Sequence, residues 1–202
     1  MRCLLILCWL LFLGPWASGQ SAGLMEYADG QKTTYRGDGT GKCLGLQFSV
    51  RYPSSWKAAD GNRPHIVQKF VNGNGAMVMV IIKDLRGVAT KAEMDRYYAT
   101  TSDLSEAVAG TFLGAQRDLT IDGEKAYAVE YSGQQKAATG MTVYQHGIQY
   151  VLFYDHYMLS VMCANGSVGD SKEDVDALFE RNRLLYGLIA SSTVITTKWN
   201  KY

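Results

Sequence analysis

The sequence feature that most constrains the fold is an unbroken apolar run at residues 76–82, AMVMVII. In an extended chain, successive side chains point to opposite sides, so Ala76 and Val78 fall on one side and Met77 and Met79 on the other. A strand that is apolar on both sides belongs in the middle of a sheet whose two faces are covered. The preceding Asn-Gly-Asn-Gly is typical of a hairpin turn and predicts an antiparallel neighbour just before it.

Further strands are predicted where apolar and polar residues alternate between turn residues. A strand at 46–52 ends at Pro53, and Trp56 follows as a lid over the core. Asp122 and Gly123 mark a tight turn between two strands. The remaining predicted strands are residues 65–71, 111–121, 125–131, 139–146, 148–155 and 159–163, with Gly147 as the turn of a hairpin.

Two helices are predicted from capping residues and apolar stripes. Thr90 and Glu93 have the spacing of a capping box, and the apolar stripe that follows ends at Gly110. Ser171 begins the second helix, whose first turn is acidic and so faces the positive end of the helix dipole. The predicted fold class is therefore α+β: an antiparallel β-sheet of about seven strands flanked by helices, an α/β/α sandwich.

The two ends of the folded part are less patterned. Residues 20–45 are rich in Gly, Asp, Gln and Thr, and we expect an extended N-terminal segment there. Residues 46–202 contain no linker or repeat and are expected to form a single domain. The tail at 191–202 is β-prone, which predicts either an edge strand or a segment lying over the surface.

Residues 1–19 have the pattern of a secretory signal peptide. Arg2 precedes an apolar run that Gly14 and Pro15 end, and Ala17 and Gly19 suit the positions before a cleavage site. The alternative, a membrane anchor, needs about 20 apolar residues, more than this run provides. We expect cleavage after Gly19 and a periplasmic or secreted protein with no stable membrane anchor.

Net charge and cysteine content limit which partners and which cellular compartment the sequence favours. Without Arg2, basic and acidic residues are equal in number, so nothing favours nucleic acid as a partner. Two of the four cysteines lie in the signal segment, which leaves Cys43 and Cys163. In an oxidising compartment such a pair predicts one disulfide, with two separate buried thiols as the alternative.

The stretch 43–85 resembles the opening of PsbP-like domains. It contains a Phe-Ser-Val-x-Tyr-Pro strand, a Trp three residues after the Pro, and a hairpin into a Met/Val/Ile strand. The helix after Thr90, the turn at 121–123 and a final helix running into 189–192 extend the resemblance over most of residues 44–195. The resemblance implies an antiparallel sheet between helices and a role in binding, nearest in character to the bacterial envelope protein DcrB.

Candidate catalytic groups are few. His65, His146 and His156 lack the spacing of a metal site, and positions on the surface or at a rim are the simpler interpretation. Glu124 and Glu130 share a strand face and would be candidates for the paired carboxylates of a hydrolase, with solvated charges as the simpler alternative. We therefore expect no catalytic residue, no metal, no cofactor and no enzymatic activity.

Tyrosines gather in the second half of the predicted sheet. A tyrosine combines an apolar ring with a polar tip, which favours interfaces, but it is also a good strand former that packs inside sheets. Under the first interpretation the binding surface would comprise Tyr127, Tyr131, Tyr144, Tyr150, Tyr154 and Tyr157.

The function expected from these features is that of an exported, non-catalytic binding or accessory protein of the bacterial periplasm. Its partner would be another envelope protein. Two alternatives stay open: an immunity or accessory factor of a secretion system, and a carrier of a small ligand or lipid held between the Tyr-rich sheet and a helix.

Overall fold

The computed structural model describes residues 21–108, 110–136 and 140–200, so the predicted signal peptide lies outside the described residues. Over these residues the chain forms a seven-stranded sheet of order β3-β4-β5-β9-β8-β7-β6, in which all neighbours are antiparallel. The strands are β3 (Lys57–Asp60), β4 (Ile66–Val71), β5 (Ala76–Asp84), β6 (Thr111–Ile121), β7 (Glu124–Lys136), β8 (Thr142–Tyr154) and β9 (Tyr157–Val168).

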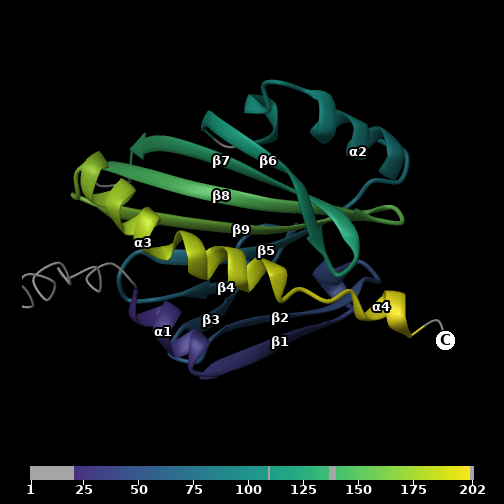
Figure 1. The fold of residues 1–202 in the computed structure, drawn as a ribbon, viewed down its shortest axis with the longest axis horizontal. Coiled ribbons are helices and arrows are strands. Elements are labelled where there is room, and N and C mark those ends of the chain that lie inside the picture. The colour runs from purple at the N-terminus through teal and green to yellow at the C-terminus, as the bar shows by residue number, and fades with distance from the viewer. Residues whose placement is uncertain (1–20, 109, 137–139, 201–202) are drawn as a thin grey trace, which may run out of the picture.

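A second, two-stranded sheet and the helices pack around the large sheet. Figure 1 shows α3 crossing one face of the large sheet beside the small sheet, with α2 on the opposite side of the molecule. The elements are β1 (Lys32–Asp38), β2 (Gln47–Pro53), α1 (Ala22–Ala28), α2 (Lys91–Thr100), α3 (Lys172–Ser191), α4 (Thr196–Trp199) and the 3-10 turns η1 (Gly41–Cys43) and η2 (Ser105–Ala107). This arrangement confirms the predicted fold class.

The main core lies between the large sheet, α3 and the small sheet. We call this side of the large sheet the closed face, because the side chains that it carries on β5 and β9 are almost fully buried. They are Val78, Val80, Ile82, Leu159, Val161 and Cys163. From the other side Phe179, Leu185 and Ile189 of α3 complete the core, and Trp56 covers its edge as predicted.

Several local predictions are confirmed. Residues 76–82 form the strand β5 in the interior of the sheet, and the hairpin turn precedes it. The backbone N–H of Thr90 donates to Glu93 Oε2 at 2.8 Å while the N–H of Glu93 donates to Thr90 Oγ1 at 3.3 Å, which completes the capping box. Asp122 and Gly123 have φ of 50° and 76° and join β6 to β7.

The predicted hairpin about Gly147 is wrong. Residues 142–154 form one continuous strand, and the turn falls instead at Asp155 and His156, where β8 meets β9. Gly147 serves close packing, since a Cβ there would lie 2.5 Å from Tyr131 Oη and 2.9 Å from the carbonyl oxygen of Cys163. A glycine inside a strand is typical of such a close approach.

The expectation of an extended, poorly patterned segment at 20–45 is also wrong. Leu24 and Tyr27 anchor α1 in the core, and β1 pairs with β2 over its full length. Only Gly37 of β1 is buried, so this edge strand carries no apolar alternation for a sequence pattern to detect.

One helical boundary differs from prediction. The helix after Thr90 ends at Thr100, and η2 follows after a short break instead of one helix running to Gly110. The C-terminal tail forms no full edge strand. Val194 makes a single bridge to Ser49, and the chain then turns into α4.

Candidate functional site

The second face of the large sheet is covered over only part of its width. The helix α2 and the turn η2 cover β7 and β8 through a small cluster that includes Tyr98, Leu104, Tyr127 and Phe153. Towards β9 and β5, Met77, Met79 and Met162 stay half-buried. The expectation that both faces are covered is therefore correct for one face and only partly correct for the other.

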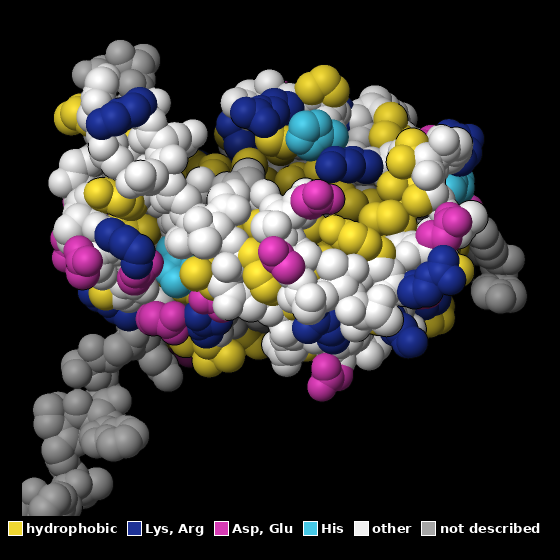
Figure 2. Space-filling view, turned by 90° about the horizontal axis from the view of Figure 1, so that it is seen from above, with side chains coloured by type: hydrophobic (Ala, Val, Ile, Leu, Met, Phe, Trp, Pro, Cys, Tyr) yellow, Lys and Arg dark blue, Asp and Glu magenta, His cyan; other side chains and the backbone are white. Residues whose placement is uncertain are grey.

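We call this region the methionine face and define it as the half-buried Met77, Met79 and Met162 with their buried neighbours Ile81, Gln149 and Ser160. The strand register brings these residues together: Met79 faces Met162 directly, Met162 faces Gln149, and Ile81 faces Ser160. Side chains on directly opposite positions of antiparallel strands lie within contact range. Figure 2, which is seen from above the view of Figure 1, shows a hollow with a hydrophobic floor that has both basic and acidic side chains at its border.

Two polar side chains in this apolar floor lack partners. The Oγ of Ser160 is buried and accepts or donates no hydrogen bond, and the residue is 0% exposed. Gln149 is 9% exposed, and its amide makes no hydrogen bond to another described residue. A buried polar group without a partner costs about 1–3 kcal/mol. An apolar floor with a few converging polar groups is the usual composition of a binding site.

The methionine face continues into a groove of about 300 Å³ at the end of the sheet. Met77 and Ala164 form part of its floor, and Val71, Val143 and Gln145 form part of its walls. This volume is at the lower end of the range of small-molecule sites, about 300–1,000 Å³.

The border of the methionine face near β3 and β4 is basic. Lys69 and Lys83 occupy the same side of the sheet as Met79, because Lys69 faces Met79 and Lys83 follows it by four residues. At this end burial lowers the pKa of His65, and the charges of Lys83 and Arg63 lower it further.

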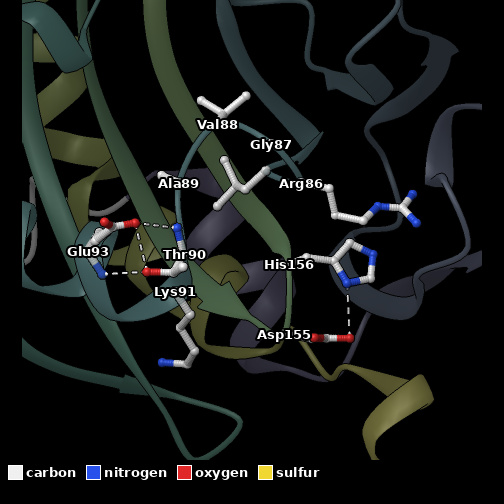
Figure 3. A pocket seen from close by; sticks show the side chains of 10 residues that line it. Arg86, Gly87, Val88, Ala89, Thr90, Lys91, Glu93, Asp155 and His156 are labelled. Atoms are coloured by element: carbon white, nitrogen blue, oxygen red, sulfur yellow. Dashed lines mark hydrogen bonds and ion pairs between the residues drawn. The ribbon is translucent and has the colours of Figure 1, made fainter.

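A second hollow, of about 480 Å³, lies where β5 leads into α2 (Figure 3). Its charged groups are engaged in pairs: Arg86 with Asp84, Lys91 with Asp95 at 2.6 Å, and His156 Nδ1 with Asp155 at 3.1 Å. Hydrogen bonds from Arg86 lower the pKa of Asp84 to about 2. Glu93 also lines this hollow and is held by Thr90 without a cationic partner, and His156 Nε2 is buried without a partner.

A charge cluster joins α3 to β7 and β8 and comprises Glu130, His146, Asp176, Glu180 and Arg183. His146 Nδ1 lies 2.7 Å from Asp176 Oδ1, and Nε2 lies 2.8 Å from Glu130 Oε1. Arg183 donates to both oxygens of Glu130 at 2.7 Å and also to Glu180. The ring of His146 stacks on Phe179 with 3.9 Å between centroids. Both ring nitrogens of His146 can donate at once only in the doubly protonated form.

The electrostatics of the charge cluster follow from these contacts. Hydrogen bonds from Arg183 hold the pKa of Glu130 below its ordinary value, against an opposing effect of burial. Burial raises the pKa of Asp176, but hydrogen bonds from Lys172 and His146 outweigh it and leave the pKa lowered. His146 contacts the carboxylates of Asp176 and Glu130 and the ring of Phe179. The cluster therefore has the composition of a structural clamp.

The histidines and glutamates considered as candidate catalytic groups have different environments in the fold. His146 is 7% exposed, so its predicted position at the surface is wrong. Glu130 belongs to the charge cluster, whereas Glu124 pairs with Lys198 at 2.8 Å, so both glutamates are paired instead of free in solvent. The described residues contain no group of three or more His, Cys, Asp or Glu side chains placed to hold a metal ion.

The predicted tyrosine surface is wrong. Tyr127, Tyr131, Tyr150 and Tyr157 are buried. Tyr127 belongs to the cluster under α2, whereas Tyr150 and Tyr157 belong to the main core on the other side of the sheet. Tyr144 and Tyr154 are half-buried. Tyrosine is used here for packing on both sides of the sheet, which separates the six side chains instead of gathering them.

The predicted disulfide is absent, and both cysteines are buried free thiols. They have different neighbours: Cys43 lies near Tyr35 and Asp38 in the region of η1, whereas Cys163 lies near Tyr150 and Tyr186 under α3. Burial raises the pKa of each thiol above its ordinary value, which makes both poor nucleophiles at neutral pH.

Met77, Met79 and Ile81 of the methionine face were present in the sequence as the second side of an apolar strand. Their partial exposure could not be predicted, because it depends on how far α2 extends over the sheet. Among the described residues, no helix combines the length and apolar character needed to span a bilayer.

Comparison with protein-family models finds no match, and comparison with curated proteins finds none either. Among solved structures, the chain is similar to LpqN of Mycobacterium tuberculosis, a protein involved in cell envelope biogenesis, with 13% identity, a TM-score of 0.43 and coverage of 87% of this chain and 98% of that one. It is also similar to PA94 of Pseudomonas aeruginosa, a protein of unknown function, with 12% identity, a TM-score of 0.40 and coverage of 80% and 95%. Both TM-scores lie below 0.5, so these similarities carry no argument about function.

Proposed function

We propose that this chain is an exported, non-catalytic binding or accessory protein of the bacterial periplasm, and that the methionine face is its binding site. The signal pattern of residues 1–19 supports export, and the resemblance to PsbP-like domains supports a binding role. The observation that carries the proposal is the group of half-buried methionines, Met77, Met79 and Met162, on the otherwise packed sheet.

The physical argument is that the free protein leaves apolar side chains partly exposed, and a partner could bury them. Met77, Met79 and Met162 are only half-buried in the free protein, and burying apolar area stabilises by about 25 cal/mol per Å². Methionine is flexible and polarisable, and it is used on surfaces that adapt to their partners.

Methionine oxidation tests this proposal directly. The purified chain is treated with hydrogen peroxide, with and without envelope extract from the organism that makes it, and sulfoxide formation is followed by mass spectrometry. We expect the extract to slow oxidation of Met77, Met79 and Met162. Met25 is the internal control, because it lies on α1, is 52% exposed and should oxidise at the same rate in both conditions.

Protection of the three methionines with no change at Met25 supports the proposed site. Equal oxidation of the three with and without extract would overturn it. Slower oxidation of Met25 by the same factor would also overturn it, because that pattern reports consumption of peroxide by the extract instead of binding.

A further inference from the structure

We propose that the methionine face binds a single-chain anionic amphiphile, with the alkyl chain on the methionine floor and the anionic group towards Lys69 and Lys83. This inference rests on the proposed function, because it takes the methionine face to be the binding site. It adds the chemical class of the ligand.

The charges around the methionine face are all of one sign on the β3–β5 side. Lys57 faces Val71 across the strand pair, Lys69 faces Met79, and Lys83 faces Met158, so all three lysines share the side of the methionine face. None of the described residues that β3, β4, β5, β8 and β9 direct to this side is Asp or Glu.

These lysines are also free of ion pairs. Every salt bridge among the described residues involves other cations, so Lys57, Lys69 and Lys83 have no carboxylate partner. Elsewhere the protein pairs its cations closely, as Lys172 with Asp176 at 2.6 Å and Lys198 with Glu124 at 2.8 Å. Three unpaired lysines beside an apolar floor complement an anionic group attached to an apolar chain.

The floor itself favours a flexible chain. Flexible methionines can follow an alkyl chain of variable shape, and the groove beyond Met77 extends the apolar floor by about 300 Å³. A plain hydrocarbon would leave the lysines without a partner.

Two other occupants fit less well. A second copy docked through this face would bring the same three unpaired lysines into a shared interface, where like charges repel. A basic or neutral segment of a protein partner would leave the lysines without compensation. The anionic amphiphile satisfies the apolar floor and the lysines together.

The test uses the full exported chain with its methionine methyl groups labelled with carbon-13. Dodecanoate, kept below its micellar concentration, is titrated and followed by methyl NMR and calorimetry. Dodecyltrimethylammonium carries the same chain with the opposite charge, and butanoate carries the same anion with almost no chain. We expect dodecanoate to shift the methyl signals of Met77, Met79 and Met162 and to leave Met25 unchanged, and we expect neither control compound to do so.

A charge reversal sharpens the assignment. Lys69→Glu should weaken dodecanoate binding by about tenfold, because it places a negative charge beside the anionic group. Arg181→Glu is the matched control, since it reverses the same charge on an exposed position of α3 and should leave binding unchanged. Unchanged methyl spectra of both free variants confirm that the fold is intact.

Three outcomes would overturn the inference: equal binding of the anionic and cationic compounds, dodecanoate binding without shifts at the three methionines, or binding only to vesicles of anionic phospholipid. A concentration-dependent dimer that buries the three methionines without ligand would also overturn it. If envelope extract protects the methionines while dodecanoate does not bind, the proposed function stands and this ligand class fails. If neither protects, both fail.

Discussion

The two faces of the large sheet are built from the same strands and differ in how they are covered. On the closed face, Val78 and Val80 meet the long helix α3 and the small sheet and are fully buried. On the other face, their neighbours Met77 and Met79 lie outside the cluster under α2 and stay half-buried. One strand of nearly uniform apolar sequence therefore serves stability on one side and leaves a binding surface on the other.

The largest effect should come from breaking the closed face. Phe179 is fully buried and stacks on His146, and we expect Phe179→Ala to lower the free energy of unfolding by about 4 kcal/mol through lost burial and a cavity. Urea unfolding followed by circular dichroism measures it. Leu184→Ala on the same helix is the control, because Leu184 is 59% exposed and its loss should cost less than about 0.5 kcal/mol. Equal costs would contradict a core under α3.

The next effect concerns the close packing between β7, β8 and β9. A methyl group at position 147 would lie 2.5 Å from Tyr131 Oη, and Tyr131 is fully buried and cannot move aside. We expect Gly147→Ala to destabilise by about 3 kcal/mol in thermal unfolding. In β6, Gly114→Ala meets nothing within 4 Å and should be neutral or slightly stabilising. A neutral Gly147→Ala would show that residues 142–154 are not one strand.

Sequence analysis succeeded where a structure depends on neighbouring residues and failed where it depends on contacts between distant residues. The Thr90–Glu93 capping box and the Asp122–Gly123 turn were predictable because their contacts span three residues or fewer. Gly147 was misread because its local signal is that of a turn, whereas its real reason, the ring of Tyr131, lies on another strand. The strand β1 was missed because its exposed residues show no periodicity.

The site was less predictable than the fold for a physical reason. The charge cluster combines positions 130, 146, 176, 180 and 183, which no spacing rule connects. The six tyrosines alternate between two faces, and only the register of the strands reveals this. The apolar character of the methionine face was readable in the sequence, but its exposure depends on where α2 ends.

The two faces should differ in how much they contribute to the pH dependence of stability. The charge cluster at the edge of the closed face contains carboxyls whose pKa values are lowered by the fold, as for Glu130 beside Arg183. A lowered pKa means that the unfolded chain binds more protons, so this stabilisation is complete above the ordinary value of 4.5 and is lost as the pH falls below it. The methionine face carries no carboxylate and should contribute nothing to this dependence.

Glu130→Gln tests this pH dependence. We expect a loss of about 2 kcal/mol at pH 7, because the hydrogen bonds from Arg183 and His146 lose their charged acceptor. The difference from the parent chain should shrink as the pH falls from about 4.5, in urea titrations at successive pH values. Glu106→Gln, on the exposed turn η2, should match the parent throughout. A difference that stays constant with pH would show that Glu130 is not held ionised by the charge cluster.

The smallest expected effect on stability comes from substituting one of two methionines on the second face of the sheet. Comparing these two substitutions also gives the sharpest test. Met158 and Met79 occupy the same side of adjacent strands, but Met158 is 5% exposed in the cluster under α2 and Met79 is half-exposed. We expect Met158→Ala to cost about 2–3 kcal/mol and Met79→Ala about 1 kcal/mol or less, measured by urea unfolding of the purified monomer. The difference arises because an exposed thioether has little transfer free energy to lose. If Met79→Ala costs as much as Met158→Ala, the methionine face is already covered in solution, and the surface on which binding has been proposed is part of the core.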